Sequence, residues 1–156
     1  MPDVLHEVTI AAAPDKVYKA LTEQQGLEAW WTTHAVAEAK VGSTVQAHFR
    51  DGQIVIKMEV VTLSPAHKVE WMTLQAIPEW RGTQITWELS PAQNGTKVFF
   101  GHRGFAPEVG LLPINAWAFY LTSLKEYLET GKGNPGGYIH DYPEHIWSPA
   151  RGPLDA

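Results

Sequence analysis

The 156-residue sequence predicts a single domain of the α+β class, in which an antiparallel sheet is followed by a long C-terminal helix. Between residues 45 and 102, several segments alternate apolar and polar side chains with the period of two that a half-buried strand requires. Residues 112–130 instead repeat apolar side chains every three or four positions, which is the period of an amphipathic helix. Short turns with no helix between them join the strands, so we expect antiparallel pairing.

The N-terminal part is expected to form one strand and two short helices. Residues 4–12 alternate and indicate a strand. Pro14 fits the first position of a helix, and Asp15 places an acid near the positive end of the helix dipole. Gly26 is expected to end this helix, and residues 27–31 indicate a second, short helical segment.

The first hairpin is predicted around Asp51 and Gly52, a pair that tolerates positive φ in a tight turn. The register that this turn sets pairs Phe49 with Ile54, so the apolar residues of both strands lie on one face. That face is expected to be buried, and the other to be exposed to water.

The remaining strands are predicted over residues 68–73, 84–89 and 97–103. Asn94 and Gly95 are expected to form the turn between the last two strands. The register of that hairpin would place His102 opposite Trp87 on the inner face.

The C-terminal helix is expected to cover residues 112–130 and to end at Gly131. The sequence is accordingly divided into a domain over residues 1–135 and an extension over residues 136–156, rich in Gly and Pro. The extension carries Trp147 among other apolar residues, so it is expected to pack on the domain or on a partner subunit.

Composition excludes several function classes. The chain has no cysteine, which excludes disulfides, thiolate metal sites and cysteine nucleophiles and suits a reducing cytoplasm. The formal net charge is −5, with no cluster of Lys and Arg, so nucleic acid is not an expected partner. No apolar stretch is long enough to span a membrane, and a cytoplasmic location is expected.

Four tryptophan residues, Trp31, Trp71, Trp87 and Trp117, fall on the inward phase of four different predicted elements. They are expected to converge on one interior, which they either fill or line as a cavity, and each brings an indole N–H that needs a partner. Inward-facing neighbours complete the predicted ligand-binding set, which is Trp31, Phe49, Met58, Trp71, Trp87, Phe100, His102, Trp117 and Tyr120.

His102 is the polar member of this set, and two roles for it remain open: a core histidine with internal hydrogen bonds, or a residue that contacts a ligand. No pair of inward carboxylates indicates acid–base catalysis, so no catalytic residue is assigned. His140, Asp141, Glu144 and His145 are close in sequence, but Pro143 prevents the regular helix that would gather them on one face. We therefore expect neither a metal site nor a cofactor.

Three segments resemble a known family: residues 10–31 (IAAAPDKVYKALTEQQGLEAWW), 95–105 (GTKVFFGHRGF) and 121–133 (LTSLKEYLETGKG). With the order of the predicted elements, they are similar to the START-like superfamily and to the family named after the activator of the heat-shock-90 ATPase. The resemblance implies a helix-grip fold, in which a curved antiparallel sheet wraps around the long C-terminal helix. It also implies an elongated pocket between sheet and helix.

Three functions then compete. The first is binding of a small apolar or aromatic molecule in the internal cavity, which the aromatic inner face favours. The second is a protein-interaction role such as chaperone co-regulation, which the family name suggests. The third is an enzyme of the cyclase or isomerase type that uses His102 as acid or base. A homodimer is also left open.

Overall fold

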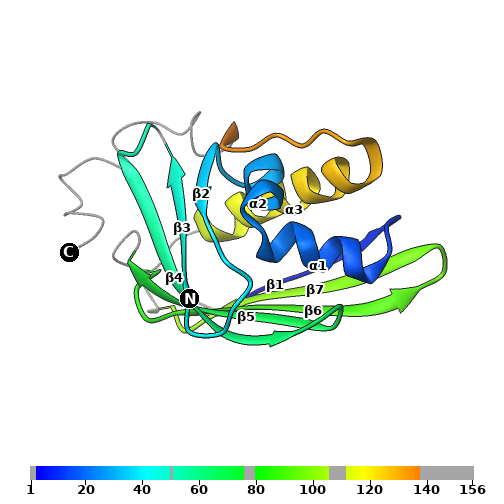
Figure 1. The fold of residues 1–156 in the computed structure, drawn as a ribbon, viewed down its shortest axis with the longest axis horizontal. Helices are drawn as coiled ribbons and strands as arrows, with labels where there is room; N and C mark the ends of the chain where they lie inside the picture. The colour runs from blue at the N-terminus through cyan, green and yellow to red at the C-terminus, as the bar shows by residue number, and fades with distance from the viewer. Residues whose placement is uncertain (1–2, 50, 76–79, 106–111, 138–156) are drawn as a thin grey trace.

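The computed structural model describes residues 3–49, 51–75, 80–105 and 112–137, and in this part of the chain three helices pack on one face of a seven-stranded sheet (Figure 1). The elements are, in chain order, β1 (Val4–Ile10), α1 (Pro14–Thr22), α2 (Gln24–Trp30), β2 (His34–Val36), β3 (Thr44–Phe49), β4 (Ile54–Ser64), β5 (Lys68–Gln75), β6 (Gln84–Ala92), β7 (Gly95–Arg103) and α3 (Leu112–Thr130).

The sheet is antiparallel throughout and has the strand order β1-β7-β6-β5-β4-β3-β2. Successive strands are neighbours from β2 to β7, and β1 returns to pair with β7, so β1 and β2 are the two edges. The helices α1, α2 and α3 lie together on one side of this curved sheet (Figure 1). This confirms the predicted α+β class and the helix-grip arrangement.

The hairpin of β3 and β4 confirms the predicted register, with Phe49 opposite Ile54. Asp51 and Gly52 both have positive φ, 55° and 85°, as the predicted turn requires. Phe49 and Ile54 are both fully buried, so the alternation of the two strands places their apolar residues on the inner face.

The predicted register of the last hairpin is wrong. Trp87 lies opposite Phe100, and His102 lies opposite Ile85. The turn consists of Gln93 and Asn94, because Asn94 takes the left-handed φ of 64° and Gly95 already belongs to β7. Moving the turn by one residue shifts the pairing by two, so His102 still faces inward as predicted.

Gly26 does not end the first helix, contrary to the prediction. α1 ends at Thr22, the extended Glu23 separates the two helices, and Gly26 lies inside α2. The reason is packing: a Cβ at Gly26 would lie 2.6 Å from Cα of Ala20 on α1. Glycine here allows two helix backbones to approach closely rather than providing a helix end.

We expect Gly26→Ala to lower the free energy of unfolding by about 1–3 kcal/mol, because the added methyl group forces α2 away from the backbone of α1. Gln25→Ala, at the exposed neighbouring position, is the control and should change stability by less than about 0.5 kcal/mol. Chemical denaturation of both variants measures the difference. Equal stabilities would show that the contact between the helices is not tight.

α3 confirms the predicted long helix in both length and orientation. It covers Leu112–Thr130, and Gly131 follows with a φ of 90° and an N–H that donates to the Tyr127 carbonyl. Trp117, Tyr120, Leu121 and Leu124 are buried on the side that faces the rest of the core. No helix in the described ranges is both long enough and apolar enough to cross a membrane.

After α3 the chain folds back onto the end of α2. The Gly136 N–H donates to the Trp31 carbonyl at 2.8 Å, and the Asn134 N–H donates to Ser123 Oγ at 2.7 Å. Ser123 Oγ in turn donates to the Trp30 carbonyl at 2.7 Å. The predicted packing of Trp147 and the excluded metal cluster at 140–145 fall outside the described residues.

Candidate functional site

The nine residues of the predicted ligand-binding set all lie in the interior, each no more than 2 % exposed. They come from seven elements or their ends: α2, β3, β4, β5, β6 and β7 contribute one side, and α3 contributes the other. The alternation of the strands and the helical repeat of α3 direct these side chains to the same place. The convergence that the sequence predicts is therefore present.

Trp31, which directly follows α2, is at the centre of the aromatic cluster. Its ring stacks on Trp71 at 5.9 Å and on Trp117 at 5.6 Å between ring centroids, and meets Phe49 edge-on at 5.8 Å. The rings of Phe49 and Tyr120 are 6.2 Å apart. Stacked and edge-to-face pairs at these separations are attractive beyond the apolar area that they bury.

A second group of rings continues the cluster along β6 and β7. Trp87 contacts Phe100 at 4.7 Å and Trp71 at 5.8 Å, and Phe100 contacts Trp117 at 4.5 Å. The His102 ring contacts that of Trp117 at 6.1 Å, so eight of the nine predicted residues are joined by ring contacts. The ninth, Met58, is buried on β4 in the same apolar core.

His102 has internal hydrogen-bond partners on both ring nitrogen atoms. The Trp117 indole N–H donates to Nδ1 at 3.0 Å, and Nε2 lies 2.7 Å from Thr83 Oγ1. An indole nitrogen can only donate, so Nδ1 must be the unprotonated nitrogen and the proton resides on Nε2. Nε2 therefore donates to Thr83, whose own hydroxyl donates to the Trp80 carbonyl.

Burial lowers the pKa of His102 to about 3, because the interior disfavours the charged imidazolium. Protonation would also place a hydrogen on Nδ1, the atom that accepts from Trp117. The ring is consequently neutral at neutral pH. Its network joins β7 to α3 through Trp117 and to the start of β6 through Thr83.

The indole N–H groups of the cluster are not all satisfied. Trp30 Nε1 donates to the Ala20 carbonyl at 2.8 Å, and Trp117 Nε1 donates to His102. Trp87 Nε1 is buried and has no hydrogen-bond partner within the described part of the chain. His6 Nε2 is a second such atom, and both His6 and Trp87 lie directly opposite Phe100 in the sheet.

Several residues of this interior are absent from the predicted set. Trp30 is fully buried and stacks on Trp31 at 5.9 Å, and Trp80 is 4 % exposed and contacts His102 edge-on at 4.8 Å. Thr83 and Thr73, whose hydroxyl oxygen atoms are 3.3 Å apart, extend the network of His102. The tryptophan content of the segments around residues 30 and 80 is the one signal in the sequence that could have identified the first two.

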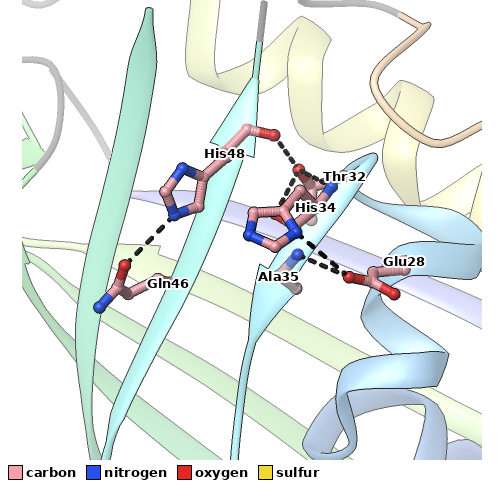
Figure 2. A network of polar contacts seen from close by, with 6 residues as sticks. All are labelled: Glu28, Thr32, His34, Ala35, Gln46 and His48. Atoms are coloured by element: carbon pink, nitrogen blue, oxygen red, sulfur yellow. Dashed lines mark hydrogen bonds and ion pairs between the residues drawn. The ribbon is translucent and has the colours of Figure 1, made fainter. Parts of the chain in front are cut away.

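A separate polar cluster lies at the β2 edge (Figure 2). His34 and His48 are cross-strand partners with ring centroids 4.8 Å apart, and the Glu28 carboxylate accepts from the Ala35 N–H at 2.9 Å. Burial is the main cause that lowers the pKa of His48, followed by the nearby His34 and Lys57. Glu28 Oε2 is 3.8 Å from His34 Nδ1, whose side chain is 61 % exposed.

This cluster orders the edge of the sheet. The Thr32 hydroxyl donates to the His48 carbonyl, and His48 Nε2 donates to Gln46 Oε1 at 3.2 Å (Figure 2). Across the described ranges, no group of three or more His, Asp or Glu residues could hold a metal ion.

Comparison with solved structures gives the same fold for proteins of several bacteria. The Aha1 dimer from Colwellia psychrerythraea has 36 % sequence identity and a TM-score of 0.75, over 85 % of this chain and 100 % of that one. The protein SSP2350 from Staphylococcus saprophyticus has 17 % identity and a TM-score of 0.72, over 85 % and 96 %. The protein MLL2253 from Mesorhizobium loti has 22 % identity and a TM-score of 0.71, over 81 % and 96 %. No curated protein matches this chain.

The family model described as "Activator of Hsp90 ATPase homolog 1-like protein" matches residues 11–129, which is most of the chain. Membership supports a ligand-binding domain in general terms and specifies neither a ligand nor a reaction. The sequence motifs, the helix-grip fold and this match together show that the chain belongs to the family of Activator of Hsp90 ATPase homolog 1-like proteins.

Proposed function

We propose that this protein binds a small, largely aromatic molecule that carries a hydrogen-bond acceptor, in the interior between the inner face of the sheet and α3. The observation that carries the proposal is the unpartnered Nε1 of Trp87, a fully buried side chain. A buried donor without an acceptor costs about 1–3 kcal/mol, and an acceptor on a ligand would recover that free energy.

The surroundings of Trp87 define the rest of the ligand. Its ring is enclosed by Trp30, Trp71, Phe100 and Trp117 at centroid distances of 4.7–6.0 Å. A flat aromatic molecule can replace such ring-to-ring contacts by equivalent ones as side chains move apart. His6 Nε2, on the other side of Phe100, offers a second polar contact at the far end of the molecule.

His102 has no role in contacting the ligand in this proposal. Both of its ring nitrogen atoms are already engaged, by Thr83 and Trp117. These hydrogen bonds, and the lowering of the His102 pKa to about 3, also give no support to the cyclase or isomerase alternative. A general acid or base needs a pKa near the working pH.

Matched pairs of probes test this function. Fluorenone and fluorene have nearly the same shape, but fluorenone alone carries a carbonyl oxygen that can accept from Trp87 Nε1. We expect fluorenone to quench the tryptophan fluorescence and to raise the melting temperature, with an affinity about tenfold higher than that of fluorene. A ligand at a hundred times its Kd stabilises by about 2.7 kcal/mol, which a thermal melt resolves.

Trp87→Phe is the matched variant, since it keeps an aromatic ring and removes the indole N–H. It should bind both probes with equal affinity. A wild-type protein that shows no thermal shift with any of a panel of such aromatic pairs of increasing size would contradict the binding function. Binding that is indifferent to the carbonyl oxygen would contradict the role of Trp87.

We also propose that the chain forms a homodimer. Its 36 % identical relative from Colwellia psychrerythraea was solved as a dimer, and that relative is covered over its full length by this chain. The fold is thus shared with the whole of the chain that was solved as a dimer. Light scattering of the purified protein tests this association directly.

A further inference from the structure

The exposed edge of the sheet at β1 is capped over only part of its length. The Thr9 carbonyl accepts a hydrogen bond from Lys125 Nζ at 2.6 Å, and the Ala11 N–H donates to Glu129 Oε2 at 2.8 Å. Lys125 and Glu129 are themselves paired at 2.8 Å. Two side chains of α3 thus take the place of a neighbouring strand from residue 9 onward.

The first half of the same edge is open. Alternate residues of an antiparallel strand direct their N–H and C=O groups to opposite sides, so Leu5 and Glu7 share the outward direction of Thr9. No described residue supplies a hydrogen-bond partner to Leu5 or Glu7 on that side. Unpaired main-chain groups at a sheet edge are a template for another strand.

The side chains beside this open edge are apolar and exposed. Leu5 is 60 % exposed and Phe99, on the adjacent β7, is 44 % exposed, both on the outer face of the sheet. Between them Gly101 leaves a hollow of about 300 Å³. Arg103 lies across this hollow, because a Cβ on Gly101 would be 2.3 Å from Arg103 Nη1.

We propose that residues 3–7 pair with the same residues of a second copy of this chain, antiparallel and about a two-fold axis at Leu5, so that the two sheets become continuous. This interface rests on the homodimer proposed above. The cap on Thr9 and Ala11 limits the register, since pairing cannot extend past residue 8 without displacing Lys125 and Glu129.

A second copy is the occupant that this edge fits. A two-fold axis at Leu5 places the outward N–H and C=O of each Leu5 opposite those of its counterpart, so each donor meets an acceptor. It also places the two exposed Leu5 side chains opposite each other, so that each covers the other. The same register sets Asp3 opposite Glu7 of the second copy, a like-charge pair that opposes association. Arg103, whose Nε lies 3.7 Å from Asp3 Oδ2, offsets part of that repulsion.

Substitution at the axis tests the interface. We expect the wild-type protein to be a dimer by size-exclusion chromatography with light scattering over a wide range of concentration. Leu5→Asp brings two carboxylates together at the axis and should weaken association at least about tenfold. Leu74→Asp is the control, because Leu74 is 45 % exposed on β5 and lies away from β1, so this variant should remain dimeric.

Circular dichroism and thermal melts of both aspartate variants verify that they are folded. A dimeric wild type whose Leu5→Asp variant is still a dimer would overturn the β1 interface and leave the homodimer standing. A monomeric wild type would overturn the homodimer and the interface together. Neither result bears on ligand binding, which the probe pairs measure separately.

A cysteine variant gives an independent test that does not depend on destabilising the interface. The chain has no cysteine, so Leu5→Cys introduces a single thiol, and the thiols of two copies would be directly opposite each other at the axis. Mild oxidation should convert Leu5→Cys rapidly into a disulfide-linked dimer and should leave Leu74→Cys mostly monomeric under denaturing conditions. Equal, slow crosslinking of the two variants would overturn the proposal.

Hydrogen exchange identifies the class of partner. In the dimer, the outward amides of Leu5 and Glu7 should be protected, and the dissociated Leu5→Asp variant should lack that protection at residue 7. Fast exchange of both amides in a dimeric sample would show that the edge is free for an extended segment of a different protein, and would overturn the assignment to a second copy.

Discussion

Acidification is expected to destabilise this protein strongly through His102. The pKa of the folded ring is about 3, below the ordinary value of 6.5 that applies to the unfolded chain. Its contribution to stability is therefore complete above about pH 6.5 and decreases as the pH falls toward about 3. At 1.36 kcal/mol per pKa unit, the full loss is about 5 kcal/mol.

Guanidinium unfolding at a series of pH values from neutral to acid measures this dependence, and His102→Gln isolates the part due to this ring. The variant should be less stable than the wild type at neutral pH, because Trp117 Nε1 loses the imidazole nitrogen that accepts its hydrogen bond. The difference in free energy of unfolding between the two proteins should decrease as the pH falls. His67→Gln, at an exposed position, is the control, and its free energy of unfolding should change with pH as that of the wild type does. If the free energy of unfolding of His102→Gln and of the wild type changed with pH in the same way, His102 would not be the source of the acid sensitivity.

Replacement of Trp31 should have an effect of similar size. Trp31→Ala removes a ring that is 1 % exposed and contacts Trp30, Phe49, Trp71 and Trp117. Truncation of a buried tryptophan to alanine costs about 3–5 kcal/mol, part of which is the cavity that remains. Denaturant midpoints give the loss, and the near-ultraviolet circular dichroism should also change, because the stacked rings lose their fixed arrangement.

Trp31→Phe is the comparison, because it retains a ring that can still pack between Trp71 and Trp117. It should lose clearly less stability than Trp31→Ala. A loss below about 1 kcal/mol for Trp31→Ala would falsify the close packing described for this interior, since the neighbouring rings would then not depend on the central one.

Periodicity predicted the parts of the fold in which a side chain's direction follows from its position in the chain. The alternation along β3, β4 and β6 identified the inner face, and the helical repeat with Gly131 gave the end of α3. The same alternation correctly predicts that His102 faces inward, although the predicted turn lies one residue too far along the chain. Such an error shifts the pairing by two positions, which leaves every side chain on the same face of the sheet.

Contacts between distant elements were not predictable in this way. Gly26 resembles a helix end in sequence, but its role depends on the distance between α2 and the backbone of Ala20. Trp80 lies in a turn in which apolar residues have no regular spacing. It reaches the core because Thr83, bonded to both the Trp80 carbonyl and His102, positions that turn. Likewise, no sequence pattern shows that Trp87 Nε1 lacks an acceptor while Trp30 Nε1 has one.

The hydrogen bonds that return the chain to α2 after α3 have a kinetic consequence. The Gly136 N–H is bonded to the carbonyl of Trp31, and Ser123 Oγ connects Asn134 to the carbonyl of Trp30. Fraying of this C-terminal segment therefore releases the end of the helix that carries the two stacked indoles. The exchange rate of one backbone amide, that of Gly136, then gives an upper limit on how often the aromatic interior opens by this route. The same frequency limits the association rate of any molecule that enters there.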